Sequence, residues 1–87
     1  MKSRVTEEFL ALFGKLPAEV QARARRNYRL WQSDPHHPGL HFKKIHSKEP
    51  IYSVRVGRSW RALGLFEEGT IYWFWIGSHS DYDKVIG

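Results

Sequence analysis

The sequence contains no cysteine and no long apolar run, and each absence excludes a class of protein. Without cysteine the chain can form neither disulfide bonds nor thiolate metal sites, which fits a reducing compartment, so we expect a cytoplasmic protein. No stretch approaches the roughly 20 apolar residues of a membrane-spanning helix. The first residues, MKSRVTEEF, also lack the apolar segment of a signal peptide. We therefore expect no membrane partner and no export signal.

Acidic residues are outnumbered as well. Among 87 residues there are 9 Asp and Glu against 14 Lys and Arg, which gives a formal net charge of +5 at pH 7. Hydrophobic residues make up 41% of the chain and aromatic residues 15%, too many for a disordered protein. This length supports one hydrophobic core, so we predict a single domain over residues 1–87. The basic surface favours a polyanionic partner, namely RNA, DNA or an acidic protein.

The first part of the chain predicts two helices that meet at Leu16-Pro17 and form an αα-hairpin. Thr6 has the residue type of a helix N-cap, and an apolar stripe follows it as far as Leu16. Pro17 suits the first turn of a second helix, which should end near Ser33 because Asp34-Pro35 follows. Four arginines on this helix form either a solvated flank or an anion-binding face: Arg23, Arg25, Arg26 and Arg29.

The rest of the chain predicts short strands, followed by a closing helical turn at 81–86. The expected strands cover residues 42–45, 51–56, 60–66 and 70–76. Their short connections imply an antiparallel arrangement, and the residues before Thr6 can add only a stub of strand. Helices followed by strands predict an α+β fold. We expect the N-terminal αα-hairpin to pack on one face of a 3–4-stranded antiparallel sheet.

Pairing the strands residue by residue brings three basic side chains to one end of the predicted sheet. If Val56 pairs with Trp60 across the intervening turn, Arg55 lies directly opposite Arg61. Two opposed arginines repel each other, at a cost of about a few tenths of a kcal/mol or more, unless an anion lies between them. His79 follows the last strand at the same end. We therefore expect Arg55, Arg61 and His79 to cluster there.

The next hairpin decides which aromatic side chains face the helices. Pairing Glu67 with Thr70 puts Ala62 opposite Trp75, so we expect Trp75 on the helix-facing side and Ile76 on the other. The other face then carries a row of apolar side chains, namely Leu63, Leu65, Tyr72 and Phe74. A monomer rarely exposes such a patch, so we expect either its own peripheral segments or a partner chain to cover it.

The predicted cluster suits cleavage of a phosphodiester. RNA cleavage by its own 2′-hydroxyl needs a base on that hydroxyl, an acid on the leaving 5′ oxygen and cations around the phosphate. His79 titrates in the useful range, Arg55 and Arg61 can bind phosphate oxygens, and Tyr82 can stack on a base or donate a proton. Three further cations can hold the RNA backbone: Lys43, Lys44 and Arg58.

A purely structural interpretation of the same residues stays open. In it His79 either caps the C-terminal turn or hydrogen-bonds Asp81, the two arginines pair with Asp81 and Asp83, and Tyr82 packs on the sheet. The pair Lys43-Lys44 then protects an exposed sheet edge from aggregation.

No motif indicates a metal or a cofactor. Four histidines crowd one segment, at His36, His37, His41 and His46, but no cysteine or carboxylate accompanies them at ligand spacing. No nucleophile elbow, phosphate-binding glycine loop or dinucleotide fingerprint is present. We therefore expect neither a metal nor a small-molecule cofactor.

The order of these segments resembles the RelE/ParE superfamily of toxins from bacterial type II toxin–antitoxin modules. The resemblance runs through nearly the whole chain. It rests on the helix–LP–helix start and on the segments DPHHPGLHFKKI, SVRVGRSWRAL and GSHSDYDKVI. It implies a compact α+β toxin whose open face is wrapped by a cognate antitoxin. RelE-like members are mRNA interferases that cut mRNA on the ribosome, whereas ParE-like members inhibit DNA gyrase without catalysing a reaction.

In the RelE-like branch, the resemblance implies that Arg55, Arg61, His79 and Tyr82 are the catalytic positions. Some members add a catalytic glutamate, but the nearest candidate, Glu49, stands in a loop and receives no role, so the general base is left open. The favoured hypothesis is a ribosome-dependent mRNA endonuclease. One alternative is a gyrase inhibitor. The other is an inactive module that only binds its antitoxin, which the shorter first strand suggests in comparison with the family.

Overall fold

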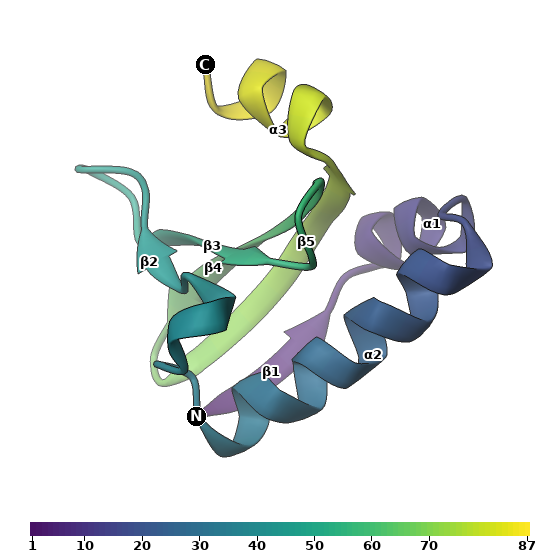
Figure 1. The fold of residues 1–87 in the computed structure, drawn as a ribbon. Helices are drawn as coiled ribbons and strands as arrows, with labels where there is room; N and C mark the ends of the chain where they lie inside the picture. Colours follow the sequence, from purple (N-terminus) through teal and green to yellow (C-terminus); the bar gives the residue numbers. More distant parts are fainter.

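The computed structural model describes residues 1–87 and has the predicted α+β architecture. A five-stranded sheet with the order β1-β5-β4-β3-β2 is covered on one face by two N-terminal helices, and a third helix lies at one end of the sheet (Figure 1). In chain order the elements are β1 (Lys2–Val5), α1 (Glu7–Gly14), α2 (Ala18–Ser33), a 3₁₀ turn η1 (Pro38–Leu40), β2 (Lys43–Lys44), β3 (Ile51–Arg55), β4 (Trp60–Glu67), β5 (Thr70–Ser78) and α3 (His79–Ile86). None of the helices has the length and apolar character that a membrane crossing requires.

The αα-hairpin forms as the sequence predicts. Thr6 is the N-cap of α1, because its Oγ1 accepts a hydrogen bond from the backbone N–H of Phe9 at 3.1 Å. Pro17 is the cap of α2 rather than its first residue, and the helix starts at Ala18. Gln21 connects the two helices, because its Nε2 donates to the carbonyl of Phe13 at 3.0 Å.

The strand count exceeds the prediction of three or four, and the sheet is not wholly antiparallel. β1 pairs in parallel with β5, from Lys2 opposite Thr70 to Val5 opposite Trp73. The N–H of Thr6 then donates to the carbonyl of Trp73 at 3.0 Å, so the N-cap of α1 is joined to the sheet. The sequence predicted only a stub of strand before Thr6, whereas β1 has four residues. The prediction was too short because backbone pairing with β5, rather than an apolar pattern, holds this edge strand.

The pairing of β3 with β4 has the predicted register. Arg55 lies opposite Arg61, and Val54 lies opposite Ala62. The N–H of Val56 donates to the carbonyl of Trp60 at 2.9 Å and closes the turn. The two guanidinium-bearing residues are therefore direct neighbours across the sheet.

The pairing of β4 with β5 departs from the prediction halfway along the strands. It runs as expected from Glu67 opposite Thr70 to Gly64 opposite Trp73. A β-bulge between Leu63 and Gly64 then shifts the register by one residue. The partners become Leu63 with Trp75, Ala62 with Ile76, and Arg61 with Gly77. Phe74 is the extra residue.

Two predictions were wrong because of this bulge. Ile76, not Trp75, faces the helices, and it is only 2% exposed in the hydrophobic core. Arg61 lies opposite Gly77 rather than Ile76. The bulge lies beside Gly64, where an added Cβ would lie 2.7 Å from a side-chain atom of Ile71 and 2.8 Å from the indole of Trp73. These two side chains fill the space above Gly64.

The core lies between the αα-hairpin and the sheet. Its centre is a pair of tryptophans, Trp31 of α2 and Trp73 of β5, whose ring centroids are 5.3 Å apart with an edge-to-face angle of 78°. Phe42 packs on both rings and on Tyr52. This aromatic cluster fixes the segment before β2, and with it the position of His41.

Candidate functional site

The two predicted arginines form the centre of the candidate site. Nη1 of Arg61 donates to the carbonyls of Trp60 at 2.8 Å, Gly57 at 3.2 Å and Arg58 at 3.4 Å, so the guanidinium is held against the β3–β4 turn. Burial lowers the pKa of Arg61, and the neighbouring charge of Arg55 lowers it further.

The first turn of α3 lies beside this pair. Tyr82 and Asp83 act on the pKa of Arg61 in the opposite direction, which puts both residues of α3 within electrostatic reach of the guanidinium. No carboxylate lies within 4.0 Å of either arginine, because the one ion pair of the structure joins His79 to Asp83. The interpretation that Asp81 and Asp83 neutralise the arginines is therefore wrong for this structure.

His79 is the first residue of α3, and two contacts fix its position. Its backbone N–H donates to the carbonyl of Ser59 at 2.7 Å, which fastens α3 to the β3–β4 turn. Its ring Nδ1 lies 3.5 Å from Oδ2 of Asp83 one turn later. The expected partner Asp81 instead gives its backbone N–H to Oγ of Ser78, the N-cap of α3, at 3.1 Å. Half of the His79 side chain is exposed, so the imidazole is accessible.

Tyr82 is the buried residue of α3, with 8% of its surface exposed. Its ring centroid lies 6.0 Å from that of His79 and 6.4 Å from that of Trp75. Because the bulge turns Trp75 to this side, Tyr82 has an aromatic surface to pack on. The structure thus brings Arg55, Arg61, His79 and Tyr82 together at one end of the sheet.

The three predicted backbone-binding cations are more scattered. Lys43 lies opposite Ser53 and Lys44 opposite Tyr52 in the two-residue edge strand β2. Paired residues share a face of a sheet and successive residues alternate, so Lys43 shares the face of Arg55 whereas Lys44 points to the other. Arg58 is exposed in the β3–β4 turn. Lys43 therefore shares a face with the arginine pair, Arg58 is exposed in the adjoining turn, and Lys44 points to the other face.

The structure adds one residue to this site, His41, which the sequence analysis considered only as a metal ligand. His41 ends η1 with a left-handed backbone, φ 47°. Its Nε2 lies 3.4 Å from Nη1 of Arg55. No local pattern signals this contact, because it depends on the turn before β2 and on the pairing of β2 with β3. No group of three or more His, Asp or Glu side chains has the arrangement of a metal site.

Glu49 does not reach the arginine pair. It lies two residues before the first residue of β3, whereas Arg55 ends that strand. At about 3.3 Å of rise per residue, the two positions are roughly 20 Å apart along the strand. Glu49 instead borders a shallow depression with Thr6, Ile51 and the apolar side chains of the open face.

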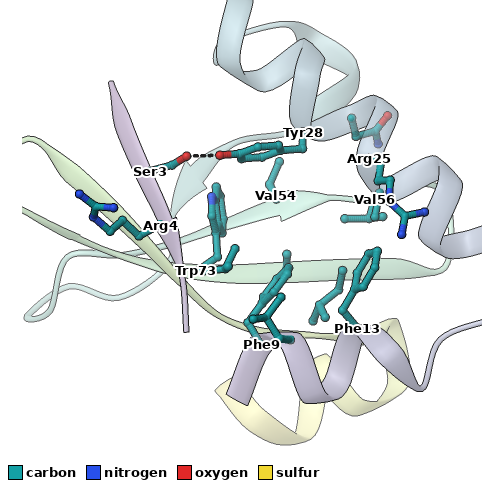
Figure 2. A pocket seen from close by; sticks show the side chains of 15 residues that line it. Ser3, Arg4, Phe9, Phe13, Arg25, Tyr28, Val54, Val56 and Trp73 are labelled. Atoms are coloured by element: carbon teal, nitrogen blue, oxygen red, sulfur yellow. Dashed lines mark hydrogen bonds between the residues drawn. The ribbon is translucent and has the colours of Figure 1, made fainter. Parts of the chain in front are cut away.

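A separate cavity of about 540 Å³ lies between the αα-hairpin and the sheet (Figure 2). Its walls are mostly apolar and include Phe9, Phe13, Val54, Val56 and Trp73. Ser3 of β1 and Tyr28 of α2 share a hydrogen bond at one side of it. Two arginines, Arg4 and Arg25, also line the cavity, and the guanidinium of Arg25 lies 5.1 Å from the ring centroid of Phe13.

Comparisons with known proteins place the chain in a family. No curated protein sequence matches the chain. The RelB–RelE antitoxin–toxin complex of Methanococcus jannaschii contains a similar chain, 17% identical, with a TM-score of 0.75 and coverage of 95% of this chain and 98% of that one. The RelE–RelB complex of Pyrococcus horikoshii contains a chain that is 12% identical, with a TM-score of 0.69 and coverage of 90% of this chain and 93% of that one. The isolated E. coli RelE toxin is 14% identical, with a TM-score of 0.66 and coverage of 99% of this chain and 98% of that one.

At these identities the likeness of the solved structures establishes the fold alone. Membership follows from the sequence model of the ParE-like toxin domain, which matches residues 18–84. This segment includes α2, four of the five strands and most of α3. The chain belongs to the ParE-like toxin domain family.

Proposed function

We propose that this protein is the toxin of a toxin–antitoxin module and acts as a ribosome-dependent endonuclease on mRNA. The observation that carries the proposal is the opposed pair Arg55 and Arg61, which has no carboxylate within 4.0 Å, with His79 attached to the same turn. Two adjacent cations that no carboxylate contacts attract an anion of matching size. A phosphodiester has two oxygens that a pair of guanidinium groups can share.

Arg61 is suited to stabilise the negative charge that develops on the phosphate oxygens during the reaction. Only its Nη1 is occupied, by backbone carbonyls, and a guanidinium carries five N–H donors. The remaining donors are therefore available to the non-bridging phosphate oxygens. Because those carbonyls hold the group rigidly, little reorganisation is needed as negative charge builds on the phosphorus.

His79 supplies a proton-transfer group beside the arginine pair. The carboxylate of Asp83 can only accept, so the contact with Nδ1 orients the ring with a proton on that nitrogen. Nε2 then exchanges protons with the substrate. The protein has a net charge of +5, and Lys43 and Arg58 are exposed. These positive charges favour binding to the RNA backbone of the mRNA and of the ribosome.

An antitoxin fits the remaining features of the surface. The M. jannaschii and P. horikoshii structures are complexes of a toxin with its antitoxin. For this chain we propose an acidic partner protein whose apolar side chains enter the 540 Å³ cavity and whose carboxylates pair with arginines such as Arg25. Burial of apolar surface in the cavity and attraction to a basic toxin act together in this arrangement.

The nuclease is tested with purified protein on ribosomes programmed with a defined mRNA. Wild-type protein should cut the mRNA, and Arg61→Ala and His79→Ala should each cut at least about 100-fold more slowly. Arg26→Ala is the matched control, because Arg26 is an exposed arginine of α2 outside the site. Intact mRNA with wild-type protein, or unchanged cutting by both site variants, would reject the proposal.

A second candidate function is inhibition of DNA gyrase, which the match to the ParE-like model favours. It predicts a DNA-damage response on expression, with intact mRNA and no dependence on His79. A growth defect with neither mRNA cleavage nor a DNA-damage response would indicate a different target. No growth effect at all would indicate a module that only binds its antitoxin. Induction in a bacterial host, with mRNA mapping and a damage reporter in parallel, separates these outcomes.

A further inference from the structure

His41 lies on the far side of the arginine pair from His79. The sheet order β5-β4-β3-β2 puts Arg61 on β4 next to β5 and α3, and Arg55 on β3 next to β2. His41 stands just before β2 and contacts Arg55, whereas His79 begins α3 directly after β5. The row across the sheet is therefore imidazole, guanidinium, guanidinium, imidazole.

The contact between His41 and Arg55 fixes the proton on the His41 ring. A guanidinium can only donate, so Nε2 of His41 must accept with a free lone pair, and its hydrogen must be on Nδ1. His79 is in the opposite situation, because the carboxylate of Asp83 faces its Nδ1. One imidazole is thus presented as a base by a cation. The other, in its imidazolium form, directs Nδ1–H to the carboxylate of Asp83 and keeps Nε2–H free to donate.

No other histidine of the crowded segment is placed in this way. His37 uses Nδ1 to accept the N–H of Gly39 at 3.1 Å, and His46 uses Nδ1 to accept backbone N–H groups of its own loop. The ring of His36 packs near Phe42, at a centroid distance of 6.2 Å. His41 is also exposed, so a substrate can reach its ring.

We infer that His41 is the general base of the endonuclease and that His79 is its general acid. This inference rests on the proposed nuclease function. Nε2 of His41 takes the proton of the 2′-hydroxyl, and the 2′ oxygen forms a bond to phosphorus. The bond from phosphorus to the 5′ oxygen breaks, and that oxygen takes a proton from Nε2 of His79, which enters the reaction as the imidazolium and leaves it as the neutral ring. The products are a 2′,3′-cyclic phosphate and a free 5′-hydroxyl.

Substrate binding frees the base in this scheme. The phosphate draws the N–H groups of Arg55 toward its oxygens. The contact between Arg55 and His41 is long for a hydrogen bond, at 3.4 Å, so it is exchanged at little cost. The same arginine that holds the unprotonated nitrogen of His41 in the free protein thus releases it when the scissile phosphate arrives.

The first experiment compares single-turnover cleavage of ribosome-bound mRNA by wild type, His41→Gln and the control His36→Gln. His41→Gln should cut about 100-fold or more slowly while its apparent affinity for the programmed ribosome changes by less than about threefold. His36→Gln should cut like wild type. If His41→Gln also cuts like wild type, His41 is not the base although the nuclease proposal survives. If wild type leaves the mRNA intact, the function and this inference fall together.

A second experiment separates a base from a residue that only positions Arg55. The scissile 5′ oxygen is replaced by sulfur, a leaving group that needs no proton. His79→Ala should regain most of its lost rate on this substrate, because the acid is no longer required, whereas His41→Ala should stay slow. Added imidazole should raise the rate of His41→Ala. Recovery of His41→Ala on the sulfur substrate, or no response to imidazole, would overturn the assignment.

Discussion

The side-chain amide of Asn27 in α2 donates a hydrogen bond from Nδ2 to the backbone carbonyl of Arg55 at 3.2 Å. Because Arg55 is the last residue of β3, this bond joins the arginine-rich helix to the strand end that carries the candidate site. Asn27→Ala should lower the free energy of unfolding by about 1 kcal/mol. Urea denaturation measures the change, with the exposed neighbour Arg26→Ala as control. Equal midpoints for the two variants would show that the bond adds no stability in solution.

Gly57 holds the turn that positions Arg61. Its φ of 91° is strained for any residue with a Cβ, and its carbonyl accepts a bond from Arg61. Gly57→Ala should therefore lower the free energy of unfolding by about 1–2 kcal/mol and slow cleavage as well. Gly14→Ala is the matched control, because an added Cβ at Gly14 meets no atom within 4 Å. It should be neutral or slightly stabilising in thermal denaturation, and a Gly57→Ala protein as stable as this control would contradict the prediction.

Lys43 and Lys44 are adjacent in sequence but point to opposite faces of the sheet. Lys43→Ala should reduce affinity for a single-stranded RNA oligonucleotide and lower the slope of log affinity against log salt by about 0.7, the loss of one phosphate contact. Lys44→Ala should leave both quantities close to wild type. Fluorescence anisotropy at several salt concentrations measures them, and equal effects from the two substitutions would argue for non-specific charge attraction alone.

Ala24 lines the cavity between the helices and the sheet, where the space is open. Ala24→Leu should enter this space and raise the melting temperature, since each added methylene that is buried contributes about 0.8 kcal/mol. The same change should weaken binding of the cognate antitoxin, measured by calorimetry. Ala11→Leu on the exposed side of α1 is the control. Tighter or unchanged binding by Ala24→Leu would place the partner elsewhere.

The sequence was sufficient for the helices, the fold class and the arginine pair. Thr6, Pro17 and the short turn after Val56 are local signals, and they fixed the αα-hairpin and the register of β3 with β4. Arg55 opposite Arg61 followed from turn length alone. The position of α3 was also anticipated in outline, although it begins at His79 rather than Asp81.

The features that escaped prediction depend on contacts between distant segments. The bulge lies beside Gly64, over which Ile71 and Trp73 pack, and no local pattern in the sequence indicates that packing. β1 is held by backbone hydrogen bonds to β5, which leave no trace in side-chain periodicity. His41 reaches Arg55 only through a left-handed residue and an edge-strand pairing, so its place in the site could not be derived from spacing.

The bulge has a consequence for how the chain can change in length. Inside a regular strand, loss of one residue exchanges the two faces of everything beyond it. Phe74 has no partner in β4, whereas Trp73 and Trp75 pair with consecutive residues. Deleting Phe74 would leave every pair on both sides in place. This position in β5 is therefore where evolution can shorten the strand by one codon while Trp75, His79 and Tyr82 stay on their present side.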